Sequence, residues 1–510
     1  MGRVSAGLHK AASTLSWLNA LLPKSPQLYA DRFAHTHELG PLVSPNWQQE
    51  AGLLLGVSSF NRVLSVRPTP RRRELGNVLV TALTRGGKGL LAKPQLLTWP
   101  HSALVVDIKG EHFEDTAGYR ITLGPVYVID PDGVGNRFDP LYGRTTEEKL
   151  YASAKYLLYQ AGERDPIFTE RAIRMLTQLF LAGREENRQL GFEKYRLLPY
   201  AGQLMALSIN QVAAHLRSVD PLIATKFLSA LYDPDKDYDE KRFLTSCWET
   251  ATSRLYPILS DEILRCFDGS DFTAEDLMTS KTPITVYLRI PEGDLKALAP
   301  MVRLISQTII HDGCAVYDKR KGKGCSPLLL LLDEAGRVKI PDLDEYATTV
   351  VGRQISLWVA IQSIKQLEVY GEANAEILMD NMDTQIFYRQ KGTTARYLER
   401  EVGYRSSYSH STTSRDGGAD TQGMSEQRVP LRTANQFKQM ADEDVIIFHH
   451  NLPPFLAKRM SWLNYPILRQ RQAMPPPKLS PLPPLTPIAL RFPLSPADED
   501  DALLNPGDFE

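Results

Sequence analysis

Short apolar runs alternate with longer amphipathic stretches along most of this chain, and the alternation predicts an α/β fold. Runs of strand length occupy residues 77–81, 103–107 and 126–130, separated by Gly or Asp turns and by stretches of helical periodicity. Uninterrupted apolar runs of this length are typical of strands that are buried on both faces of a largely parallel sheet. The pattern returns later and predicts further strands at residues 284–290, 328–332, 356–361, 384–388 and 445–448.

Between these two groups of strands, residues 145–269 carry no strand pattern. Apolar residues recur there at helical spacing, most clearly over residues 172–181 and 205–216. This spacing predicts amphipathic helices. We therefore predict an all-alpha domain inserted into an α/β domain that comprises residues 76–144 and 270–468.

The two ends of the chain depart from this pattern. Residues 1–75 mix helical patches with prolines and end in a basic connector at residues 67–73, so we predict an N-terminal segment and linker. Residues 469–510 are proline-rich and end in an acidic stretch at residues 498–501. This composition predicts a disordered tail with polyproline character.

Charge and cysteine content narrow the classes of function. The chain carries 59 Lys and Arg against 60 Asp and Glu, a net charge of -1, so any DNA contact must come from local patches or an assembled ring. Its four cysteines show neither a CxxC pair nor a histidine at zinc spacing, and we expect free thiols in a reducing cytoplasm. No apolar run reaches the roughly 18 residues of a membrane span. We expect a soluble protein with no membrane span of its own.

A glycine-rich turn follows the first predicted strand and opens a predicted helix. The turn and helix start comprise Thr84, Arg85, Gly86, Gly87, Lys88, Gly89 and Leu90. Backbone N–H groups and one lysine in this context can bind phosphate oxygens. The standard spacing would place a glycine at Ala82 and a magnesium-binding hydroxyl at Gly89, so the motif is imperfect. Such turns also arise by chance, and this one alone leaves nucleotide binding open.

Two later strands end in residues suited to nucleotide hydrolysis. A leucine run ends in Asp333 and Glu334, and the next strand ends in Gln362. One carboxylate can bind Mg²⁺, the next can activate water, and the amide can sense the γ-phosphate. A core strand with a capping Asp-Glu pair is the alternative for the leucine run in isolation. Together with the glycine-rich turn, these strand ends predict a site for ATP and Mg²⁺.

Two sets of basic residues are further candidates. Arg353 precedes the strand that ends in Gln362, and an arginine there can neutralise charge in a neighbouring subunit's site or form a surface salt bridge. The loop before the leucine run is a candidate DNA contact, although a solvated hairpin tip explains it about as well. Its basic residues are Lys319, Arg320, Lys321 and Lys323.

Several of these segments resemble the nucleotide-binding block of type IV secretion coupling proteins, the TraG/TraD-like conjugation ATPases. The resemblance covers about residues 76–468. It rests on the glycine-rich turn, Leu97-Thr-Trp-Pro, Asp107-Ile-Lys-Gly-Glu111, Leu331-Leu-Asp-Glu334 and the segment 361–371. The Asp-Ile-Lys-Gly-Glu block is the most specific part, because chance phosphate loops lack it.

This resemblance implies a RecA-like nucleotide-binding domain with an inserted all-alpha domain, a homo-hexameric ring, and ATP hydrolysis that drives transfer of DNA. It implies that Lys88 holds phosphate, Asp333 binds Mg²⁺, Glu334 activates water and Gln362 senses the γ-phosphate. Arg353 would act as an arginine finger in the adjacent subunit.

The implied partners are DNA, single-stranded and carried with a relaxase, and secretion-channel proteins at the bacterial inner membrane. Members of the family usually begin with transmembrane helices, whereas this sequence has no such run. We therefore expect a cytoplasmic protein that works peripherally at that membrane. The resemblance gives Asp107, Lys109 and Glu111 no fixed role.

Two other functions stay open on the sequence. A hexameric DNA pump of the FtsK/HerA type would act on duplex DNA in segregation or packaging. A non-hydrolysing adaptor would bind nucleotide and dock substrates through the helical domain. Lys88 and the intact Asp333 and Glu334 favour hydrolysis over the adaptor.

Overall fold

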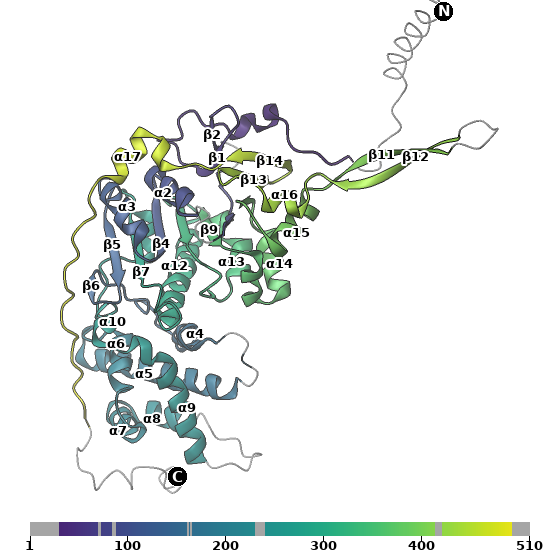
Figure 1. Ribbon diagram of the computed structural model, residues 1–510. Coiled ribbons are helices and arrows are strands. Elements are labelled where there is room, and N and C mark those ends of the chain that lie inside the picture. The colour runs from purple at the N-terminus through teal and green to yellow at the C-terminus, as the bar shows by residue number, and fades with distance from the viewer. Residues whose placement is uncertain are drawn as a thin grey trace, which may run out of the picture.

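The computed structural model describes residues 30–69, 73–83, 88–160, 163, 166–229, 240–413 and 421–491. A sheet of twelve strands runs through this described part of the chain (Figure 1). Seven neighbouring strands at its centre are parallel. In spatial order these are β10 (Thr384–Phe387), β3 (Val78–Thr81), β9 (Ile355–Ile361), β8 (Leu328–Leu332), β4 (Ser102–Ile108), β7 (Thr285–Ile290) and β5 (Val126–Asp130).

Antiparallel strands extend the sheet on both sides. They are β13 (Asp444–His449), β14 (Leu452–Lys458), β1 (Leu53–Val57) and β2 (Val63–Val66) beyond β10, and β6 (Val134–Gly135) beyond β5. All eight predicted strands are present within a few residues of their expected bounds. The hairpin β1–β2 corrects the expectation that residues 1–75 are only a segment and linker, because β1 pairs with β14.

Alternate residues of the central strands enter two separate hydrophobic cores. Leu104 and Val106 of β4 belong to one core, and Ala103 and Val105 belong to the other. This division follows from the two-residue period of a strand. The first core continues into α12 (Ala299–Arg320) and the helical insertion. The second is covered by α2 (Lys88–Thr98), α3 (Glu111–Arg120) and α17 (Pro466–Gln472).

The predicted helical insertion lies between β6 and β7, and in its described residues every regular element is helical. It contains α4 (Glu147–Leu158), α5 (Ile167–Leu190), α6 (Leu197–Leu204), α7 (Ile209–Val219), α8 (Pro221–Ser229), α9 (Glu240–Leu255), η2 (Tyr256–Ile258), α10 (Asp261–Arg265) and α11 (Ala274–Thr279). Local sequence sets these bounds. Ser208 and Gln211 form a capping box at the start of α7, and Gly191 ends α5 in the left-handed conformation.

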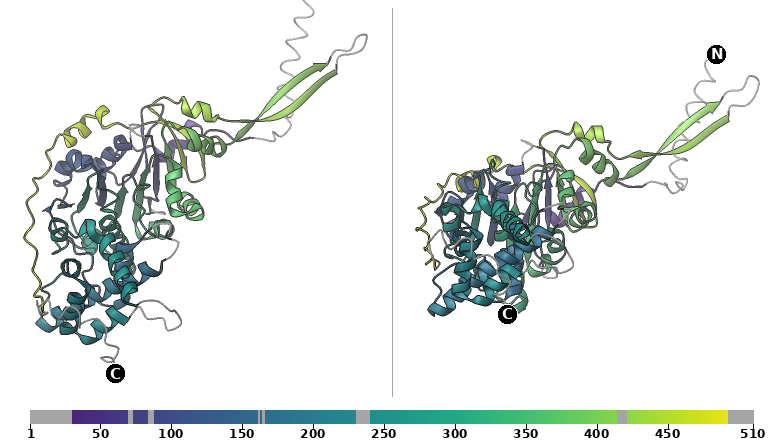
Figure 2. Two further views of the ribbon diagram at one scale, coloured as in Figure 1. Left: turned by 60° about the horizontal axis from the view of Figure 1, so that its bottom comes forward. Right: turned by 90° about the horizontal axis from the view of Figure 1, so that it is seen from below.

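The remaining elements surround the sheet. They are η1 (Thr36–Leu42), α13 (Leu343–Thr349), η3 (Val351–Arg353), η4 (Ile364–Tyr370), α14 (Glu372–Asp380), α15 (Gly392–Glu401), α16 (Ala434–Lys438) and η5 (Trp462–Asn464). A two-stranded ribbon, β11 (Tyr404–Thr413) and β12 (Thr421–Pro430), projects from the body of the molecule (Figure 2). Among the described helices, none has the length and apolar character required to cross a bilayer.

The tail after α17 differs from the expected disorder as far as residue 491. It runs along the outside from α17 to the helical insertion (Figures 1 and 2). Ser480 and Leu482 form backbone hydrogen bonds to Gly135 and Gly133 at 2.8 and 2.9 Å, and the Thr486 backbone N–H donates to Asp268 at 2.8 Å. These bonds join the tail to both parts of the molecule. Residues 492–510 lie outside the described residues.

Candidate nucleotide site

Three of the parallel strands end at the same edge of the sheet, which we call the carboxyl edge. Strand β9 lies between β3 and β8, with Thr81 opposite Ile361 and Leu332 opposite Val359. The segments that follow these strands are the glycine-rich turn, Gln362, and the pair Asp333–Glu334. Parallel pairing therefore brings together three motifs that are up to 280 residues apart in sequence.

Helix α2 begins at the carboxyl edge, directly after the glycine-rich turn. Its first residue is Lys88, so its unpaired N–H groups and positive dipole end lie where a phosphate loop requires them. Gly89 lies in the first turn of this helix. Of the predicted phosphate contacts, Thr84, Arg85, Gly86 and Gly87 lie outside the described residues, as do the side chains of Lys88 and Leu90.

Glu334 is held in one orientation by Gln362. The Gln362 Nε2 group donates to both carboxylate oxygens of Glu334 at 2.9 Å. The Gln362 backbone N–H in turn donates to Gln366 Oε1 at 2.6 Å. Glu334 is only 8% exposed and has a φ of 58°, a conformation that is uncommon for a residue with a side chain. Such backbone strain concentrates at functional sites, where surrounding contacts maintain it.

Asp333 contacts a buried histidine that the sequence analysis did not identify. His112 Nε2 lies 3.4 Å from Asp333 Oδ2. Burial lowers the pKa of His112, but the bond to Asp333 and the negative charges of Asp107 and Asp333 outweigh it, so the pKa is raised overall. A signal was present in the sequence, since His112 directly follows the Asp-Ile-Lys-Gly-Glu block.

The Asp-Ile-Lys-Gly-Glu block forms the turn from β4 into α3. Asp107 accepts hydrogen bonds from the backbone N–H groups of His112 at 3.2 Å and Phe113 at 2.7 Å, and so caps α3. Burial raises the pKa of the Asp107 carboxyl group. Lys109 and Gly110 have φ values of 91° and 76°, which reverse the chain between strand and helix. The block therefore fixes the position of α3, and with it the position of His112.

The chemistry at this edge fits a magnesium nucleotide. Mg²⁺ at such sites is held by one or two carboxylates together with phosphate and water oxygens. Asp333 keeps a side-chain exposure of 20%, so it is accessible from the edge. Thr81 Oγ1 and Gln390 Oε1, beside the glycine-rich turn, are buried without a hydrogen-bond partner in the described structure. Asp333 would hold the ion, and a bound nucleotide would supply partners at this edge.

Arg353 and the basic loop lie at the opposite, amino edge of the sheet. Arg353 donates to Asp318 through Nε and Nη2 at 2.9–3.0 Å, and through Nη1 to the Thr349 carbonyl at 3.0 Å. The seven-residue strand β9 separates Arg353 from Gln362, a length of about 23 Å. Arg353 therefore cannot reach the carboxyl edge of its own subunit.

The predicted DNA-contacting residues share this amino edge. Lys319 and Arg320 end α12, Lys321 caps it in the left-handed conformation, and Lys323 follows in the turn before β8. All four are exposed. Arg320 pairs with Glu275 at 2.7 Å. The loop is thus a basic surface, separate from the nucleotide site.

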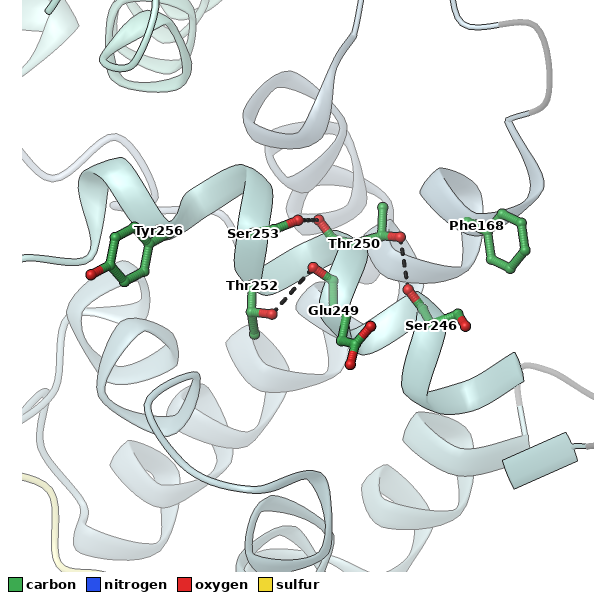
Figure 3. A pocket seen from close by; sticks show the side chains of 7 residues that line it. All are labelled: Phe168, Ser246, Glu249, Thr250, Thr252, Ser253 and Tyr256. Atoms are coloured by element: carbon green, nitrogen blue, oxygen red, sulfur yellow. Dashed lines mark hydrogen bonds between the residues drawn. The ribbon is translucent and has the colours of Figure 1, made fainter. Parts of the chain in front are cut away.

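An open depression of about 820 Å³ lies on the helical insertion, between α5 and α9 (Figure 3). Its hydroxyl groups bond to the helix itself, as Thr250 does to the Ser246 carbonyl at 2.7 Å and Thr252 to the Trp248 carbonyl at 3.0 Å. It contains none of the predicted site residues. Its lining residues are Phe168, Ser246, Glu249, Thr250, Thr252, Ser253 and Tyr256.

The strand order β10-β3-β9-β8-β4, with the glycine-rich turn after β3 and the acidic pair after β8, defines a P-loop NTPase fold of the RecA-like class. The family model described as Type IV secretory system Conjugative DNA transfer matches residues 69–481. The chain therefore belongs to this family.

Relatives of known identity agree with this assignment. The conjugal transfer protein TraG of Escherichia coli is 25% identical over 470 residues, which cover 79% of this chain and 70% of TraG. The protein VirD4 of Rhizobium radiobacter is 25% identical over 417 residues, covering 76% of this chain and 57% of VirD4. The chain thus spans a little more than half of VirD4.

Among solved structures, the bacterial conjugative coupling protein TrwBdeltaN70 in complex with sulphate has a similar fold. The TM-score is 0.61 at 15% identity, and the match covers 86% of this chain and 95% of that protein. TrwB has also been solved with the non-hydrolysable ATP analogue ADPNP and with ADP and Mg²⁺. The TrwB match confirms the predicted RecA-like fold with a helical domain.

Proposed function

We propose that this chain is the ATP-hydrolysing coupling protein of a conjugative type IV secretion system, which recruits a DNA–protein substrate and drives its transfer. One observation carries the proposal: Gln362 holds Glu334 by two hydrogen bonds at the carboxyl edge, where α2 begins. A buried carboxylate in a fixed orientation is suited to act on water rather than to bind a surface partner. Family membership supports the transfer function.

We assign each residue a role in ATP hydrolysis from its position at the carboxyl edge. Lys88 and the N–H groups at the start of α2 bind the phosphates, and Asp333 binds Mg²⁺. A bound Mg²⁺ would supply positive charge against the phosphate oxygens during ATP hydrolysis. Glu334 orients the attacking water and accepts its proton, and Gln362 fixes Glu334 and lies where it can respond to the γ-phosphate.

Arg353 completes the site of a neighbouring subunit in a homo-hexamer. Its position at the amino edge, about 23 Å from its own Gln362, supports a role between subunits. Single-stranded DNA with its relaxase contacts the basic loop at residues 319–323, and secretion-channel proteins bind the assembly at the inner membrane.

ATP turnover by the wild type and by Glu334→Gln, with and without single-stranded DNA, tests the proposal. We expect DNA to stimulate the wild type, and Glu334→Gln to bind ATP but lose turnover. Glu368→Gln is the matched control, since Glu368 is an exposed glutamate on η4 near the same edge. Unchanged turnover in Glu334→Gln would contradict the motor function. ATP binding without hydrolysis in the wild type would indicate an adaptor.

A further inference from the structure

The contact between His112 and Asp333 has no role in the proposed function so far. We infer that His112 is a positioning residue, which holds the Asp333 carboxylate in the orientation that binds Mg²⁺. This inference rests on the proposed function. It adds a residue that acts through Asp333 and does not itself touch the nucleotide.

The geometry leaves Asp333 as the polar partner of the imidazole ring. His112 is 3% exposed, and its Nε2 lies 3.4 Å from Asp333 Oδ2. Its Nδ1 atom is buried and has no hydrogen-bond partner in the described part of the chain. An unpaired buried nitrogen costs free energy, so the contact with Asp333 is the interaction that compensates the burial of this ring.

Helix α3 gives the ring a fixed base. Asp107 caps the helix at its start through the His112 and Phe113 N–H groups. Four residues after His112, the Thr116 hydroxyl lies 2.6 Å from the Tyr287 hydroxyl on β7. At the end of the helix, Arg120 donates to the Thr285 hydroxyl at 2.7 Å. These bonds tie both ends of α3 to the sheet, so the ring cannot follow a displaced Asp333 outward.

The arrangement matches the way proteins orient carboxylate ligands of metals. Hydrogen bonds from the surrounding shell fix the ligand before the ion binds, and their loss typically weakens metal affinity 10–100-fold. Asp333 is reached by His112 from inside the protein, while 20% of its side chain stays exposed. We therefore expect removal of the His112 contact to weaken binding of Mg²⁺ while nucleotide binding without the ion stays intact.

Two amide variants test the inference. Glutamine at position 112 places an N–H at about the distance of histidine Nε2, whereas asparagine is one bond shorter. We expect His112→Asn to raise the Mg²⁺ concentration for half-saturation about 10–100-fold, and His112→Gln to stay within about threefold of the wild type. Affinity for a fluorescent ATP analogue, measured in EDTA and across a Mg²⁺ titration, provides the readout, and steady-state turnover against Mg²⁺ provides a second.

His215→Asn is the matched control, because His215 is another buried histidine whose Nε2 lies 2.9 Å from the Tyr200 hydroxyl in the helical insertion, away from Asp333. It should lower the melting temperature and leave the Mg²⁺ titration unchanged. Equal Mg²⁺ affinities in His112→Asn and His112→Gln would overturn the inference, as would a shift in His215→Asn as large as that in His112→Asn. A wild type that binds no ATP would overturn the proposed function itself.

Discussion

The two edges of the parallel sheet are built in opposite ways. At the carboxyl edge, Glu334 and His112 are buried and Gln362 is half-buried, and each contacts another of these residues or the neighbouring Asp333. At the amino edge, Arg353 and the basic residues of the 319–323 loop extend from helix ends and turns. The carboxylates that pair with Arg353 and Arg320 are exposed. The carboxyl edge holds its side chains in fixed orientations before a ligand binds. The amino edge presents positively charged side chains on an accessible surface.

This difference assigns separate tasks to the edges. Hydrolysis requires groups held within fractions of an ångström, which buried hydrogen bonds provide. Contacts with DNA phosphates or with another subunit tolerate mobile side chains, because they depend on charge more than on orientation. Substitutions at each edge test whether the two edges are independent within one subunit.

The largest effect is expected from Arg353→Ala. If Arg353 acts in a neighbour's site, its loss should lower turnover by about 10³-fold or more. Its distance from its own Gln362 means that any such loss must arise between subunits. Turnover of mixtures of Arg353→Ala with Glu334→Gln tests this, because mixed rings regain sites that have both residues. A surface salt bridge alone would leave turnover unchanged.

Gln362→Glu should have the next largest effect. The substitution places a second carboxylate where Nε2 now donates to both oxygens of Glu334. Two hydrogen bonds are replaced by repulsion between like charges, so we expect turnover to fall about 100-fold, with a smaller fall in Gln362→Ala. Steady-state ATPase assays of both variants test whether Gln362→Glu loses more turnover than Gln362→Ala. A purely structural role for Gln362 would not produce this order.

Replacing Lys319, Lys321 and Lys323 together by alanine should change only the affinity for DNA. Three lost phosphate contacts reduce the slope of log affinity against log salt by about 2 for single strands, and reduce affinity roughly tenfold at moderate salt. Basal turnover should not change, because the loop lies at the other edge. The control replaces the exposed Lys149, Lys155 and Lys438, which changes the net charge equally. An equal loss of DNA affinity in this control would remove the loop from the DNA surface.

The smallest effect is expected from Asp318→Asn. Asp318 is Arg353's partner within the subunit and is 54% exposed. Such surface ion pairs contribute about 1 kcal/mol or less to the free energy of unfolding. Thermal unfolding should therefore shift by only a few degrees, with turnover unaffected. A large loss of turnover here would mean that Asp318 fixes the orientation of Arg353.

The sequence predicted the parts of this fold that local pattern determines. Buried strands appear as apolar runs, and Asp333, Glu334 and Gln362 stand directly after such runs. The pairing of β1 with β14 joins residues 57 and 458 and has no local signal. His112 was missed for a similar reason, since its partner Asp333 follows β8, far from α3 in sequence, and burial rather than spacing makes the contact significant.

The proline-rich composition of the tail also led to an expectation of disorder that does not hold for residues 473–491. Prolines disfavour helices and central strands, but they do not prevent an extended chain from pairing through the backbone groups of its other residues. Ser480, Leu482 and Thr486 supply those groups. Gly118 supplies the space on α3, because a Cβ there would collide with the Met474 carbonyl oxygen.

The path of this tail would limit any swing of the helical insertion against the sheet. A chain that is already extended cannot lengthen, since each residue spans at most about 3.6 Å. A hinge opening between the insertion and the sheet would therefore have to break the hydrogen bonds of the tail in sequence, from Thr486 toward Ser480. The tail acts as a tether with a fixed maximum reach, and truncation before residue 473 would widen the range of motion without changing a single residue at either edge of the sheet.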